Sequence, residues 1–117
     1  GGAVAPGLRL GVEALASRTA HLTEIDLEAP VSDVVGTTSY ACVQSGVIFG
    51  TAAMLDGMIG RFEESVGLTL ACVATGDLAP SVLCHCRREI IYRRELVHRG
   101  LLLLWHKNSK TVSASAR

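Results

Sequence analysis

The chain has 117 residues, with 11 basic and 11 acidic side chains, and 49% of its residues are hydrophobic. This length supports one domain with a hydrophobic core and is too short for two typical domains. Because the charges balance, we expect no general attraction to nucleic acid or to anionic lipid. The composition therefore predicts a single globular domain that binds neither.

Compartment signals are weak in this sequence. The four cysteines are too few for a disulfide-stabilised scaffold. Residues 1–6 lack the basic and apolar regions of a secretory signal. The most apolar window, residues 40–55, contains polar residues and is shorter than the roughly 20 residues of a membrane span. We therefore expect reduced thiols, no membrane association and a cytoplasmic location.

The first expected elements are short. An apolar segment, residues 1–5, ends at a proline-glycine turn at residues 6–7. Apolar residues then recur at helical spacing from Leu8 to Leu22, which predicts a helix. Residues 25–27 alternate like a brief strand and lead into extended chain.

The longest expected element is a helix over residues 38–66, because this stretch has no proline and keeps a helical spacing of apolar residues. Its broad apolar face comprises Tyr40, Val43, Val47, Met54, Leu55, Met58, Ile59 and Phe62. Gln44 and Thr51 fall inside this face and therefore need buried hydrogen-bond partners. Only Ser45, Asp56 and Glu63 are left for solvent, so we expect burial on most sides.

A second face of this helix carries only small residues. They recur at three- and four-residue intervals and are Ser39, Cys42, Gly46, Gly50, Ala53, Gly57 and Gly60. Each interior glycine costs about 0.5–1 kcal/mol relative to alanine. Four aligned glycines therefore favour another backbone packed along this small-residue stripe, in this chain or in a partner. A chance alignment in a glycine-rich chain is the alternative.

Strands and helices alternate after the long helix, which predicts an α/β arrangement. Gly67 is expected to end the long helix as its C-terminal cap. The elements expected next are a buried strand over 68–74, a helix over 78–88, a strand over 90–92 and a helix over 96–105 interrupted near Gly100. Residues 109–117 are small and polar without periodicity, so we expect a disordered tail.

One loop stands where α/β folds bind ligands. Thr75-Gly76-Asp77 follows an expected strand and precedes an expected helix. An ordinary turn in which Asp77 caps the helix explains the same residues, and on the residues alone it is the preferred interpretation. At the start of the long helix, either Thr37 or Thr38 is expected to cap, which leaves the other free to contact a ligand.

Other candidate residues have simple structural explanations. The glycines Gly1, Gly2 and Gly7 suit either close approach to a ligand or a tight turn. Cys84-His85-Cys86 brings soft ligands together, but adjacent helical residues point apart and no second pair stands at zinc-site spacing. The residues alone therefore show no complete catalytic constellation.

Several stretches together nevertheless resemble the C-terminal half of type III pantothenate kinases, which belong to the acetate and sugar kinase, Hsp70 and actin superfamily. They occur in the family's order and near its spacing, and they are Gly1-Gly2-Ala3-Val4-Ala5-Pro6-Gly7-Leu8, Ala14-Leu15, Thr19-Ala20-His21-Leu22, Gly36-Thr37-Thr38, Gln44-Ser45-Gly46, Asp56-Gly57, Val73-Ala74-Thr75-Gly76, Leu78-Ala79 and Gly100-Leu101.

The resemblance implies a ribonuclease H-like (actin-like ATPase) half-domain with a long central helix. Residues 1–108 would form the C-terminal domain and residues 109–117 the disordered tail. It implies a kinase that transfers the γ-phosphoryl group of ATP to pantothenate in coenzyme A biosynthesis, with Mg²⁺ and a monovalent cation, K⁺ or NH₄⁺. It also implies a homodimer, or a heterodimer with a related subunit, through the helix over 38–66.

By the same resemblance, Thr38 and Gly2 lie on the substrate side and Thr75 and Gly76 on the nucleotide side. The family's general-base aspartate and its cation-binding aspartate have no counterpart in this sequence, so we expect the chain alone to be inactive. Asp77 replaces a glycine of the nucleotide loop, where its charge would repel nucleotide. A non-catalytic dimerisation or interaction module derived from such a kinase is therefore the alternative.

Overall fold

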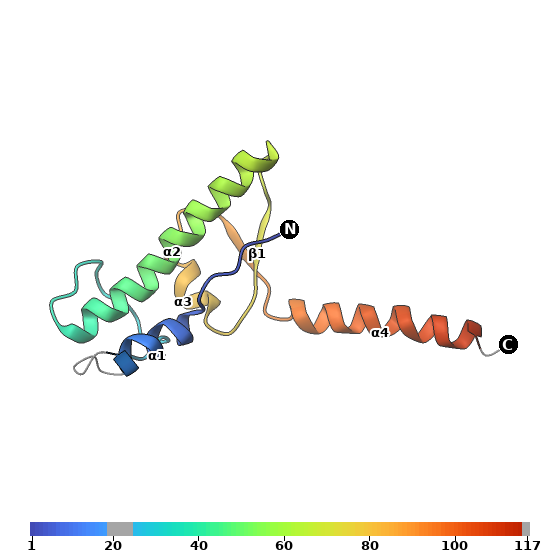
Figure 1. The fold of residues 1–117 in the computed structure, drawn as a ribbon, viewed down its shortest axis with the longest axis horizontal. Coiled ribbons are helices and arrows are strands. Elements are labelled where there is room, and N and C mark those ends of the chain that lie inside the picture. The colour runs from blue at the N-terminus through green and yellow to red at the C-terminus, as the bar shows by residue number, and fades with distance from the viewer. Residues whose placement is uncertain (19–24, 116–117) are drawn as a thin grey trace.

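The computed structural model describes residues 1–18 and 25–115 as a mixed α/β chain (Figure 1). Its elements are α1 (Leu8–Arg18), α2 (Ser39–Val66), β1 (Cys72–Ala74), α3 (Ala79–Leu83), β2 (Ile90–Tyr92) and α4 (Leu96–Ser115). α1 and α3 pack against α2, whereas α4 extends away from the other elements (Figure 1). The expected continuation of the first helix over Ala20 and Leu22, and the matching stretch Thr19–Leu22, lie outside the described residues.

α2 begins and ends where the sequence predicts. Thr38 has an extended backbone and its hydroxyl accepts a hydrogen bond from the Ala41 N–H at 3.1 Å. At the other end, Gly67 adopts the left-handed conformation with φ 69° and donates its N–H to the Glu63 carbonyl. These two caps satisfy backbone groups that a helix of this length leaves open at its ends.

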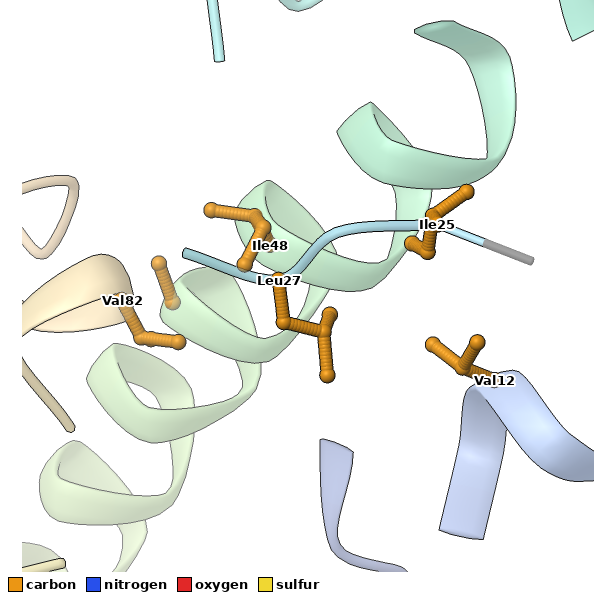
Figure 2. Packing of buried hydrophobic residues seen from close by; sticks show 6 residues of the cluster. Val12, Ile25, Leu27, Ile48 and Val82 are labelled. Atoms are coloured by element: carbon orange, nitrogen blue, oxygen red, sulfur yellow. The ribbon is translucent and has the colours of Figure 1, made fainter. Parts of the chain in front are cut away.

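The buried face of α2 is narrower than the expected apolar face. Ile48 and Ala52 are almost fully buried, and they belong to a core completed by Val12, Ile25, Leu27 and Val82 (Figure 2). Tyr40, Met54 and Phe62 are instead more than a third exposed. Ser45, which we expected in solvent, is buried because its hydroxyl donates to the carbonyl of Val34 in the preceding loop.

Polar side chains of α2 hold the segment that precedes it. The Gln44 Nε2 donates to the carbonyls of Asp26 and Ala29 at 3.2 and 3.1 Å, and the Thr51 hydroxyl donates to Val47 within the helix. The expectation of bonded polar groups inside the apolar face is confirmed. The strand expected over residues 25–27 is wrong, because Gln44 rather than a neighbouring strand satisfies this backbone. Ile25 and Leu27 are nevertheless buried, as their alternation indicates.

The sheet consists of β1 and β2, which pair in parallel with Val73 opposite Ile91. β2 matches its predicted range. The strand expected over 68–74 is shorter, because only its last three residues pair with β2 while the Leu70 N–H bonds the Glu63 carboxylate. It is also not buried, since Leu68 and Val73 are 68% and 51% exposed.

The last two helices differ from their expected lengths. α3 ends at Leu83 because the following loop is held to α2, where the Asp56 carboxylate accepts from the N–H groups of Arg87 and Arg88 at 2.8 and 3.1 Å. Asp56 is therefore half-buried rather than solvated. α4 passes through Gly100 without interruption and continues to Ser115, into the range where we expected an irregular tail. No proline or glycine follows Gly100 to end it.

The small-residue stripe of α2 is open. A Cβ added at Gly46, Gly50 or Gly57 would meet no atom within 4 Å, whereas at Gly60 it would lie 3.4 Å from the Arg88 guanidinium. Within the described residues, no backbone of this chain packs along the three central glycines. α2 also has the length and apolar composition of a membrane span, a weak indication because core helices of soluble proteins share both.

Candidate functional site

A cavity of about 680 Å³ lies where α1, the middle of α2 and the connection from β1 to α3 meet. It is lined by Gly7, Leu8, Arg9 and Leu10 from the start of α1, Thr51 and Leu55 from α2, and Val73, Ala74, Thr75, Gly76, Asp77, Leu78, Ala79, Val82 and Leu83 from β1 to α3. The fold therefore brings the glycine turn at residues 6–7 beside the loop Thr75–Asp77. The sequence predicts both the turn and the loop as possible ligand contacts, but it does not predict that they lie together.

The loop Thr75–Asp77 is tied to the end of β2 and to the chain just after it. Gly76 has φ 116°, a conformation that residues with a side chain rarely adopt. Its carbonyl accepts from the Ala79 N–H and from the Tyr92 hydroxyl, both at 3.2 Å. The Thr75 hydroxyl donates to the Arg94 carbonyl at 3.4 Å. A hydrogen bond that involves a side chain therefore holds each of the first two residues of the loop.

Asp77 does not cap α3 as the simple interpretation of this loop predicted. Leu78 occupies the N-cap position, and no side chain bonds the start of α3 there. The Asp77 carboxylate is instead exposed at the cavity wall, and Arg9 supplies a positive charge to the same lining. Most of the other lining residues are apolar, so the cavity suits a ligand that has an apolar body and a few polar groups.

The residues expected on the substrate side lie elsewhere. Thr38 caps α2 and is absent from the cavity lining; Thr51, which does line it, stands about 20 Å further along the helix axis at about 1.5 Å per residue. Thr37 lines a separate small cavity beside Gly36. Thr38 therefore caps α2 and Thr37 does not, which agrees with the expectation that only one of the two is a cap. Gly2 is exposed and its backbone has no neighbour within 4 Å of an added Cβ.

The Cys84-His85-Cys86 stretch is spread over three environments. Cys84 is exposed, the His85 ring lies against Phe49 with centroids 4.5 Å apart and the ring planes tilted by 60°, and Cys86 points toward the Ala52 and Val82 carbonyls. Burial raises the pKa of the Cys86 thiol, and Asp56 and Cys84 add to this. Across residues 1–18 and 25–115, no three His, Cys, Asp or Glu side chains gather as a metal site requires.

Sequence reasoning missed two polar contacts that shape this region. The Arg88 guanidinium pairs with Glu63, and the pKa of Glu63 is lowered first by the Leu70 N–H and then by Arg88. The Tyr92 hydroxyl reaches the Gly76 carbonyl. Both contacts join residues far apart in the sequence, so no local spacing indicates them. The pairing of β1 with β2 is the feature that creates the second.

Comparison with known proteins identifies the family. A family model described as type III pantothenate kinase matches residues 1–61, which is just over half of the 117 residues. The chain belongs to the type III pantothenate kinase family. This match covers α1 and most of α2, and so includes Gly7, Thr51 and Leu55 of the cavity lining.

Individual type III pantothenate kinases match a longer part of the chain. The protein from Acholeplasma laidlawii is 42% identical over 107 residues, covering 92% of this chain and 43% of the relative. Those from Mycobacterium sp. (strain KMS) and Mycobacterium leprae (strain Br4923) are 40% and 39% identical, covering 92% of this chain and 42% of each relative. The chain thus spans about two fifths of these pantothenate kinases and corresponds to their C-terminal part.

Proposed function

We propose that this chain is the C-terminal domain of an ATP-dependent kinase that phosphorylates pantothenate in coenzyme A biosynthesis. The observation that carries the proposal is the cavity in which the glycine turn before α1 faces the Thr75–Asp77 loop, in a chain of this family. On this proposal the cavity holds the nucleotide, and Thr75 and Gly76 contact it. Their hydrogen bonds to Tyr92 at the end of β2 and to Arg94 just after it support this role, because a preorganised loop loses less entropy on binding.

The pantothenate side is proposed to involve a second subunit. Thr38 stands about 20 Å from Thr51 along one helix, too far to serve the cavity of its own chain. The open small-residue stripe at Gly46, Gly50 and Gly57 offers a second α2 a close approach. We propose a homodimer, or a heterodimer with a related subunit, through residues 38–66, in which Thr38 reaches the partner's site. Gly2 is assigned to the substrate side on the resemblance alone.

The groups that carry out phosphoryl transfer are proposed to lie outside this sequence. Phosphoryl transfer depends on metal ions and positioned charges, and the described residues hold no cluster of three His, Cys, Asp or Glu side chains. Mg²⁺ would therefore arrive bound to ATP, and the ligand of K⁺ or NH₄⁺ would lie in the part that the relatives carry before this segment. We propose that the same part extends the β1–β2 pair into a ribonuclease H-like sheet.

A non-catalytic dimerisation module is the second candidate. Asp77 favours it, because a carboxylate in the cavity wall repels the phosphates of a nucleotide. For either candidate we propose a cytoplasmic location, which the four unpaired cysteines support.

Calorimetric titration of the 117-residue chain with ATP separates the two candidates. The kinase domain is expected to bind ATP and to lose about tenfold or more in affinity with Gly76→Val, because a branched side chain cannot adopt φ 116° without strain. Gly100→Val in α4, where an added Cβ meets no atom within 4 Å, serves as the control. Failure of the unaltered chain to bind ATP would reject the kinase proposal and leave the dimerisation module.

A further inference from the structure

Tyr92 links the two strands of the sheet at the edge of the cavity. It is the last residue of β2 and stands opposite Ala74, the last residue of β1, in the parallel register. This register places the Tyr92 side chain beside the loop that leaves β1. Its hydroxyl donates to the Gly76 carbonyl at 3.2 Å.

The hydrogen bond from Tyr92 fixes the peptide group between Gly76 and Asp77. A trans peptide is planar, so its carbonyl and its N–H point in opposite directions. The Gly76 carbonyl is held by the Tyr92 hydroxyl and the Ala79 N–H. The Asp77 N–H therefore points away from both, and among the described residues it makes no hydrogen bond.

Gly76 is the residue of this loop whose backbone most needs a tether. Glycine populates positive and negative φ about equally, so φ 116° is only one of several backbone conformations open to Gly76. Thr75 is fixed by its own bond to the Arg94 carbonyl. Within the described part of the chain, Tyr92 is the only side chain that bonds Gly76.

Tyr92 approaches from outside the proposed nucleotide cavity. It lines a neighbouring cavity of about 770 Å³ together with Arg93 and Arg94, whereas Gly76 and Asp77 line the cavity of about 680 Å³. We infer that Tyr92 is a positioning residue: its hydroxyl orients the Gly76–Asp77 peptide so that the Asp77 N–H is presented to the nucleotide. This inference rests on the proposed nucleotide-binding function of the cavity.

The test compares Tyr92→Phe with Tyr40→Phe in the 117-residue chain. Tyr40 is a matched control because its hydroxyl also makes one bond to backbone, from the Asp26 N–H at 3.3 Å, at the far end of α2. Calorimetric titration should show ATP affinity weakened about three- to tenfold by Tyr92→Phe, the size of one lost hydrogen bond, and unchanged by Tyr40→Phe. A purely structural role of Tyr92 predicts instead a lower ligand-free melting temperature of Tyr92→Phe with unchanged ATP affinity.

Amide NMR on the unaltered chain gives a second readout that does not depend on the variant's folding. Saturating ATP should shift the Asp77 amide resonance and slow its hydrogen exchange. Two results would overturn the positioning role while leaving nucleotide binding intact. One is equal ATP affinity in Tyr92→Phe and the unaltered chain, and the other is an Asp77 amide whose resonance and hydrogen exchange do not change when ATP binds. Absence of ATP binding to the unaltered chain would overturn both.

Discussion

Asp77 places a carboxylate on the wall of the cavity that we propose for ATP, beside the tethered Gly76. Because this side chain neither caps α3 nor joins an ion pair among the described residues, its charge is free to act on a ligand. Exposed charges act through solvent, so the effect is moderate and depends on ionic strength. On the proposed function, we expect this residue to weaken the binding of a nucleotide.

We therefore expect Asp77→Gly to strengthen ATP binding about five- to thirtyfold at low salt, since it removes a repulsion of about 1–2 kcal/mol near the phosphates. Asp77→Asn, which keeps the size of the side chain, should recover most of the gain if charge rather than bulk is the cause. Titrations at low and high salt measure both. A weaker ATP affinity in Asp77→Gly would show that the carboxylate helps to bind the nucleotide.

Glu63 makes a pH-dependent contribution to stability. The Leu70 N–H and the Arg88 guanidinium lower the pKa of this carboxyl below its usual 4.5. The unfolded chain therefore binds the proton first as pH falls, and the stability from Glu63 is complete above about pH 4.5 and lost below it. Glu63→Gln should melt at a lower temperature than the unaltered chain at pH 7, with a difference that shrinks toward pH 3. Glu64→Gln is the exposed neighbouring control, and an equal effect there would contradict the assignment.

At the scale of elements, α2 organises the chain through two faces. One face packs α1, α3 and the segment before the helix around Ile48. The other is the small-residue stripe, which the described residues leave open at Gly46, Gly50 and Gly57. Because glycines in a helix interior are destabilising, an open row of them supports our proposal that a partner helix packs there.

Gly50→Leu tests this partner. The side chain would meet nothing within the described chain, so folding should be retained while a close helix–helix contact is blocked. We expect a dimer that dissociates, with Kd raised at least tenfold, as measured by sedimentation. Gly11→Leu in α1, which also meets no neighbour within 4 Å, is the matched control. An unchanged dimer in Gly50→Leu would place the interface elsewhere.

Local patterns predicted the elements well where local chemistry decides them. The absence of proline and the Thr38 and Gly67 caps delimit α2, and β2 matches its range. Contacts between distant residues decided the rest. Asp56 ends α3 early by binding the Arg87 N–H, and Gln44 takes the place of a strand beside Asp26. Neither contact corresponds to a residue spacing that can be recognised in the sequence.

The candidate site was predicted in part. The loop Thr75–Asp77 and the turn at Pro6-Gly7 were predicted from their glycines as possible ligand contacts. Their meeting in one cavity depends on how α1 and α3 pack on α2. Tyr92 was not predicted, because its contact with Gly76 follows from the parallel register of the two strands. The roles of Thr38 and Gly2 remain predictions from the family resemblance.

At the scale of the whole molecule, much apolar surface is uncovered. α4 carries exposed leucines from Leu101 to Leu104 and an exposed Trp105, and residues at these consecutive positions point to all sides of the helix. The β1–β2 pair is likewise open at Val73 and Ile91, although parallel sheets are normally covered on both faces. Both features agree with a chain that spans about two fifths of its relatives.

The central claim is that this chain binds the nucleotide for a reaction whose catalytic groups lie elsewhere. The most direct measurement is the phosphorylation of pantothenate by ATP, assayed with the 117-residue chain alone and with the remaining N-terminal part of the Acholeplasma laidlawii relative added. We expect no turnover by the chain alone and turnover by the mixture. Turnover by the chain alone would contradict it.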